Sequence, residues 1–144
     1  MVELDKTMSA LGRASLFQSL SKSQLERLAQ RFVEREYEAA EAIVSQGKGG
    51  EGFFVIVAGE AKVVRETLDG DKVVVNEFAA GDYFGELALL DEGLRTASVI
   101  TTAPTSCLVL TRWDFLGLLK SDAAIAVAIL QELAKRFRLA LNAM

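Results

Sequence analysis

The sequence has no histidine, and only one cysteine, Cys107, and one proline, Pro104, among its 144 residues. Without histidine the chain cannot build histidine-based metal sites, hold haem through a proximal histidine, or use Ser-His-Asp or Cys-His catalysis. One cysteine cannot form an internal disulfide or hold an iron–sulfur cluster within the chain. We therefore expect no metal site and no enzyme activity, and we expect Cys107 to be a buried small hydrophobe.

Long apolar runs and a signal sequence are missing as well. No apolar run approaches the ~18 residues that cross a bilayer, and the N-terminus lacks the basic-then-apolar order of a secretory signal. The formal charge is −4, from 16 basic and 20 acidic residues, which argues against a protein that mainly coats nucleic acid. We expect a cytoplasmic protein with no membrane segment.

The composition is that of a folded domain, with 51% apolar and 25% charged residues. The length predicts one domain over residues 1–144. Helical patterns occupy about 3–34 and about 112–142, and strand patterns occupy about 37–111. Capping signatures mark the starts of three helices: Ser21 with Gln24, Thr111 with Asp114, and Ser121 followed by Asp122.

The central block is built from short strand candidates. Five segments are rich in strand-forming residues: 53–57, 61–66, 72–78, 97–102 and 107–111. Asp69-Gly70 separates two of them and is a strong hairpin signal, because glycine tolerates the positive φ of tight hairpin turns. Short strands with glycine turns favour a barrel over a parallel sheet. The sequence thus predicts an α+β fold: an antiparallel β-roll, like a jelly-roll barrel, flanked by helices at both ends.

The segment of residues 84–98, which contains Gly85 and Gly93, interrupts the β block and carries the chemistry. Gly85 lets a ligand approach the backbone, and the first amides of a helical turn starting at Glu86 have no helical partner, which favours an anion. Arg95 can fold back over this turn and offer a fixed fork of donors to a phosphate. A carboxylate beside a phosphate site repels the phosphate, so Glu86 is expected to bind another group of the ligand. It can accept a hydrogen bond from a sugar hydroxyl. The pattern indicates a site for a ribose phosphate.

The segments 84–90 (FGELALL) and 95–99 (RTASV) closely resemble the phosphate-binding cassette of cyclic nucleotide-binding domains. That family includes the regulatory subunits of protein kinase A, cyclic nucleotide-gated channels and bacterial catabolite activator proteins. The resemblance extends to residues 43–47, 53–61 and 113–119, and it covers roughly residues 11 to 140.

The resemblance implies a role for each cassette residue. Arg95 corresponds to the arginine that pairs with the exocyclic phosphate oxygens, and Glu86 to the carboxylate that accepts from the ribose 2′-hydroxyl. Thr96 stands where a hydroxyl or amide touches the phosphate or the base. Further implied positions are the backbone contacts Gly85, Leu87 and Ala88, the small residue Ala97, and the lid candidates Phe137, Arg138 and Leu141 on a C-terminal helix that closes over the base.

The resemblance therefore implies a sensory module that binds cAMP and signals through its C-terminal helix, with no cofactor besides this ligand. Two alternatives stay open. The Thr96 hydroxyl can favour cGMP, and a degenerate domain can keep the fold for protein contacts alone. An enzyme on a cupin-type barrel is a poorer match, because such enzymes usually bind metal through histidines.

The C-terminal helix also suggests partners. Ala126, Ile129, Leu133 and Ala140 form a roughly heptad-like stripe, which predicts a weak homodimer or contact with an effector domain. About 24 residues follow Lys120, enough for one helix, so we expect no DNA-binding domain in this chain. Trp113 is predicted to pack at the start of a helix.

Overall fold

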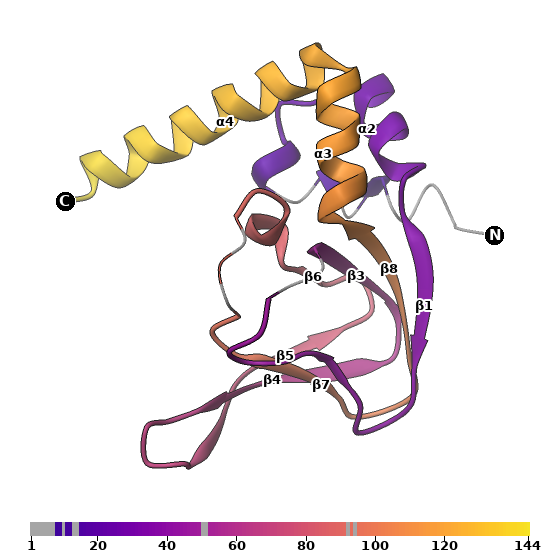
Figure 1. Ribbon diagram of the computed structural model, residues 1–144, viewed down its shortest axis with the longest axis vertical. Coiled ribbons are helices and arrows are strands. Elements are labelled where there is room, and N and C mark those ends of the chain that lie inside the picture. The colour runs from indigo at the N-terminus through magenta and orange to yellow at the C-terminus, as the bar shows by residue number, and fades with distance from the viewer. Residues whose placement is uncertain (1–7, 10, 13–14, 50–51, 92, 94) are drawn as a thin grey trace.

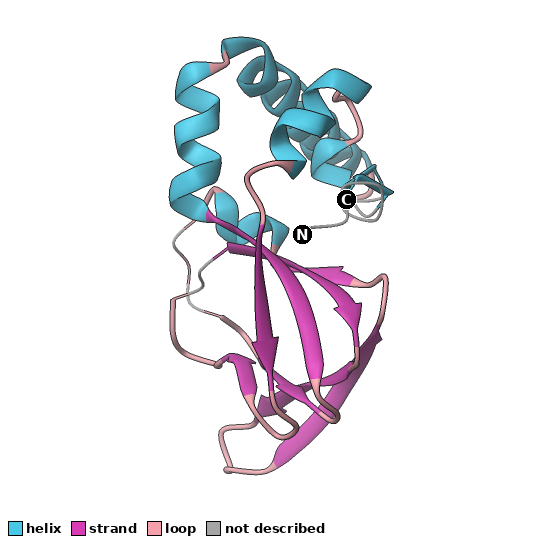
Figure 2. Ribbon diagram, turned by 90° about the vertical axis from the view of Figure 1, so that its right-hand side faces the viewer, coloured by secondary structure: helices cyan, strands magenta, loops and turns pink. Residues whose placement is uncertain are grey.

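The computed structural model describes residues 8–9, 11–12, 15–49, 52–91, 93 and 95–144. In this part of the chain, eight strands form two four-stranded antiparallel sheets, and the helices gather at one end of the roll (Figures 1 and 2). The strands are β1 (Val33–Tyr37), β2 (Ala42–Val44), β3 (Gly52–Ala58), β4 (Glu60–Glu66), β5 (Lys72–Ala79), β6 (Tyr83–Phe84), β7 (Ser98–Thr101) and β8 (Thr105–Thr111). The predicted α+β fold with an antiparallel β-roll is confirmed.

The sheets have the orders β1-β8-β3-β6 and β2-β7-β4-β5. The Asp69-Gly70 turn joins β4 to β5 as a hairpin, and Gly70 has the positive φ of +86° that this turn requires. β1 begins at Val33, within the region where the sequence predicts helix, because residues 33–37 pair with residues 105–109 of β8. The roll therefore starts about four residues earlier than the pattern suggests.

The helices are η1 (Ser15–Phe17), α2 (Lys22–Ala29), η2 (Glu86–Leu89), α3 (Arg112–Ser121) and α4 (Ala123–Asn142). Ser21 forms the expected capping box with Gln24, and the Thr111 hydroxyl accepts from the Asp114 amide. Asp122 caps α4 by accepting from the Ile125 amide, and it also pairs with Arg27 of α2. The junction between α3 and α4 is thus fixed to α2.

β3 has a continuously apolar sequence because both of its faces are buried. Phe53 and Val55 pack into the core between the roll and the helices, whereas Phe54 and Ile56 pack inside the roll. A strand buried on both faces needs apolar side chains in both directions. Cys107 lies inside the roll and is fully buried, and this burial raises the pKa of its thiol to about 11. It is a small core residue, as expected.

α4 runs past the roll and ends away from it (Figure 1). The buried residues of α4 are Ile125, Ile129 and Glu132, which face the domain. From residue 137 onward every side chain of the helix is exposed. Trp113, at the start of α3, is 77% exposed, so the expectation that it packs there is wrong.

Candidate ligand-binding site

The cassette begins from a fixed aromatic stack. β6 pairs with β3 through Phe84 and Tyr83. The Phe84 ring stacks between Phe54, with ring centroids 5.0 Å apart, and Phe78, at 5.3 Å. These rings hold the residue that precedes Gly85, so the following turn starts from a defined point.

Gly85 is required by both its conformation and its neighbours. Its φ is +86°, a region that side chains rarely adopt. A Cβ atom here would lie 2.5 Å from the Gly52 carbonyl oxygen and 2.8 Å from Nη1 of Arg95. The chain then enters η2, whose Leu89 is fully buried in the helical core. Glycine thus lets the backbone approach the arginine closely.

Arg95 is held at both its backbone and its side chain. Its amide donates to the Lys48 carbonyl, and its own carbonyl accepts from the Gly47 amide, each at 2.9 Å. Its Nη2 donates to the Gly52 carbonyl oxygen at 2.9 Å. The three groups come from the loop before β3 and from the first residue of β3, so the guanidinium has a fixed position.

The positive charge of the Arg95 guanidinium is not compensated by any residue that the structure describes. Nε is enclosed without a hydrogen-bond partner, and no carboxylate among the described residues pairs with the side chain. Desolvation by burial lowers the pKa of Arg95, although an arginine remains charged at neutral pH. A half-buried, fixed cation with free donors suits an anionic ligand.

A surface cavity of about 470 Å³ lies over the cassette. Six of the seven predicted contact residues line it, and Ala97 is the one that does not. The cavity also has two lining residues that the sequence analysis missed, Asp91 and Gly93, and the Gly93 amide donates to Asp91 Oδ1 at 3.1 Å. Among the described residues, the lining consists of Gly85, Glu86, Leu87, Ala88, Asp91, Gly93, Arg95 and Thr96.

Glu86 lines the cavity, but its carboxylate also contacts the helices. Oε2 accepts from the Leu16 amide at 3.4 Å, and Oε1 lies 3.6 Å from Nη2 of Arg136. The neighbouring Ala88 amide donates to the Gly85 carbonyl at 3.0 Å, so the turn itself uses that donor. No sequence signal pointed to Leu16 or Arg136, because both lie at least 50 positions from Glu86.

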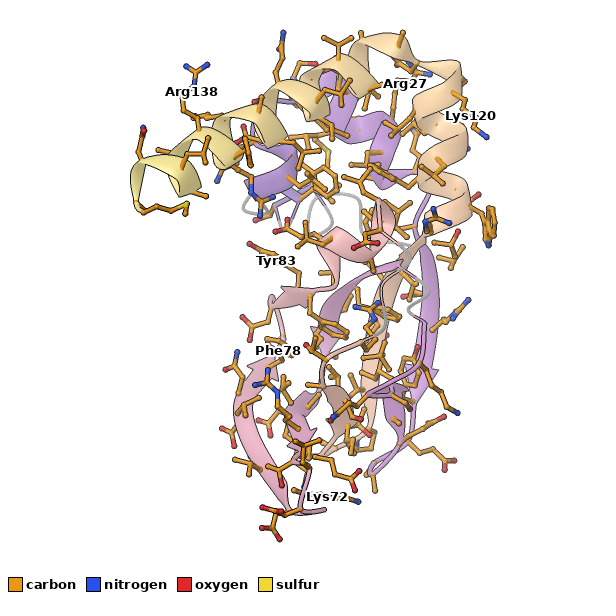
Figure 3. The ribbon with its side chains drawn as sticks, turned by 60° about the vertical axis from the view of Figure 1, so that its left-hand side comes forward. Arg27, Lys72, Phe78, Tyr83, Lys120 and Arg138 are labelled. Carbon is orange, nitrogen blue, oxygen red and sulfur yellow. The ribbon has the colours of Figure 1, made fainter. Side chains whose placement is uncertain are left out.

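The three lid candidates lie outside the cavity lining. Phe137 is 66% exposed and Leu141 is 51% exposed, and Arg138 points away from the roll (Figure 3). Closure over a base therefore stays a prediction for the occupied site.

The described residues contain neither a membrane-spanning helix nor a cluster of metal-binding side chains. No helix among them combines the length and apolar character needed to cross a membrane. No group of histidine, cysteine or carboxylate side chains within the same residues has an arrangement that holds a metal ion.

Comparison with known families gives a match over most of the roll. Residues 34–122 match the family model described as "Cyclic nucleotide-binding domain". The matched range contains the cassette, the aromatic stack and Arg95.

Curated relatives and solved structures agree with this match. A cAMP-dependent protein kinase regulatory subunit of Mycosarcoma maydis is 43% identical over 62% of this chain, and a cGMP-dependent protein kinase of Caenorhabditis elegans is 38% identical over 75%. The chain spans only 17% and 14% of these two relatives. The N-terminal domain of a transcriptional regulator from Streptomyces coelicolor superimposes with a TM-score of 0.83, at 27% identity, covering 94% of each chain.

Proposed function

Because the chain belongs to the cyclic nucleotide-binding domain family, we propose that the cavity over the cassette binds a cyclic mononucleotide, with cAMP preferred. One observation carries the proposal. Arg95 is fixed by the Gly52 carbonyl and pairs with no carboxylate among the described residues, and it lies at the wall of a cavity that Glu86 also lines. An anion and a sugar hydroxyl on one small ligand satisfy both groups.

Arg95 is the phosphate-binding residue in this proposal. Its Nη2 donates one N–H to Gly52, so the second N–H of Nη2 and those of Nη1 are the donors we assign to the phosphate. Two donors in one plane can bind two oxygens of a phosphate, a geometry that lysine does not offer. The charge-assisted contact forms without first breaking an ion pair with a described carboxylate, so it costs little to form.

Glu86 and Thr96 complete the recognition of the nucleotide. The Glu86 carboxylate accepts from the ribose 2′-hydroxyl, and the exposed Thr96 side chain lies at the cavity wall where it meets the phosphate or the base. Support for cAMP comes from the regulatory-subunit relative, the more similar of the two kinase relatives described above. The free Thr96 hydroxyl favours cGMP as the second candidate.

A weak homodimer formed through the exposed side of α4 is the second part of the proposal. The stripe predicted from the sequence is wrong, because Ile129 is 2% exposed and packs into the core, and Leu133 packs against it. A second row on α4 follows the predicted stripe by one residue, has the a/d spacing of a heptad, and is exposed along its whole length. Its members are Val127, Leu130, Ala134, Phe137 and Leu141. A helix with such a row pairs with its copy, and an effector helix of similar pattern is the alternative.

Calorimetric titration of the chain with cAMP, cGMP and linear 5′-AMP tests the proposed ligand. Binding of a cyclic nucleotide, with weaker binding of the linear one, supports the proposal. If none of the three binds, the domain keeps the fold for protein contacts only, and the proposed function is wrong.

A further inference from the structure

Glu86 is in contact with two elements outside the cassette. Leu16 belongs to η1, and Arg136 lies near the last domain-facing turn of α4. Both oxygens of the carboxylate are used, at 3.4 Å from the Leu16 nitrogen and 3.6 Å from the Arg136 nitrogen. One carboxylate therefore joins the cassette to both ends of the helical layer.

The contact lies where α4 leaves the domain. Glu132, one turn before Arg136, is 4% exposed and accepts from the Ser19 hydroxyl at 2.7 Å. Leu133 packs against the core, and Arg136 is the last residue of α4 with a described contact to the domain, because the helix after it is exposed. The pair between Glu86 and Arg136 thus fixes the last docked turn of α4.

The same carboxylate lines the ligand cavity. We propose that the ligand and α4 compete for Glu86: a sugar hydroxyl that donates to this carboxylate weakens its pair with Arg136 and releases the C-terminal half of α4 from its present position, from which it can move over the base. This inference rests on the proposed function. Coupling of this kind is reciprocal. The factor by which the ligand weakens docking of α4 through Arg136 is also the factor by which this docking lowers the affinity for the ligand.

The geometry suits a contact that is easily exchanged. The side chains of Arg136 and Glu86 are 32% and 18% exposed, and both contacts to Glu86 are longer than a normal charged hydrogen bond. Ion pairs with this exposure change an equilibrium by about 1.5- to 5-fold. A ligand can therefore displace Arg136, and the effect on affinity is small but measurable.

The test compares Arg136→Met with Lys135→Met. Both substitutions remove one positive charge from adjacent positions of α4, and Lys135 is exposed. We expect R136M to bind the cyclic nucleotide about two- to fivefold more tightly than K135M. In the ligand-free proteins, amides 133–142 exchange hydrogen faster in R136M than in K135M. In a Glu86→Gln background, the two variants have the same affinity.

The outcomes separate this inference from the proposed function. If the parent binds no cyclic nucleotide, the proposed function is wrong. If the parent binds, but R136M has the same affinity as K135M or a lower one, competition for Glu86 is wrong and the proposed ligand stands. Equal exchange of amides 133–142 in the two ligand-free variants also overturns it, because Arg136 then does not hold α4.

Discussion

Nη2 of Arg95 lies 2.9 Å from the carbonyl oxygen of Gly52, a residue 43 positions earlier in the chain. This bond fixes the guanidinium against the first residue of β3, and Gly85 leaves room for it by lacking a side chain. The charge is thus in place before a ligand arrives, so binding does not need to order a flexible side chain.

Substitution of Gly85 by alanine tests the close approach of the backbone to Arg95. Gly70 has the same φ of +86° but has open space around it, whereas a Cβ on Gly85 meets Gly52 and Arg95. We expect G70A to lose about 1 kcal/mol of stability and to bind ligand normally. We expect G85A to lose more and to bind at least tenfold more weakly. Urea denaturation and calorimetry measure both, and equal effects of the two variants would contradict the account.

Replacement of Thr96 by alanine tests the choice of base. If the hydroxyl contacts guanine, the affinity for cGMP falls about 3- to 10-fold, because a hydrogen bond is lost. If cAMP is the preferred ligand and Thr96 does not read the base, the ratio of the cAMP and cGMP affinities changes less than threefold. A tenfold preference of the parent for cGMP that disappears in T96A would reverse the assignment.

The buried thiol of Cys107 predicts a loss of stability at alkaline pH. Burial raises the pKa of Cys107 to about 11, whereas an unfolded cysteine has a pKa of about 8.5. Between these values the unfolded chain loses the proton and the folded one keeps it, so the free energy of unfolding falls as pH rises. From pH 8 to pH 11 the parent should lose about 1–3 kcal/mol more than Cys107→Ala. Urea denaturation across this range measures the difference, and identical pH slopes would refute it.

The exposed row on α4 predicts a dimer that one charge disrupts. Leu130 is 64% exposed at the centre of the row, and Gln131 next to it lies off the row and is also exposed. Sedimentation at increasing concentration should show weak dimerisation of the parent and of Gln131→Glu, and a monomer for Leu130→Glu. If the parent stays monomeric at millimolar concentration, the proposed homodimer is wrong.

Features set by neighbouring residues were predictable from the sequence. The capping box at Ser21, the hairpin at Asp69-Gly70 and the apolar run around Phe54 each depend on a few adjacent residues, and each appears as expected. β1 was missed because its sequence, VEREY, is largely polar, and it becomes a strand by pairing with β8 about 70 positions away.

The sequence alone could not show which face of α4 is buried against the domain. Ile129 and Leu130 both belong to apolar rows with heptad spacing, and neighbouring residues on a helix point about 100° apart. Only the packing of Ile129 into the core identifies which row is free. The contact of Glu86 with Arg136 was unpredictable for a similar reason, because it depends on where α4 crosses the cassette.

The most direct test of the account is the affinity of Arg95→Ala for the cyclic nucleotide. Loss of a charge-assisted bidentate contact should weaken binding by about 2–4 kcal/mol, or about 30- to 1000-fold in Kd. Arg31→Ala, which removes an exposed arginine outside the cavity lining, is the matched control and should bind as the parent does. Circular dichroism confirms that both variants are folded. An Arg95→Ala protein that is folded and binds as tightly as Arg31→Ala would contradict the central claim.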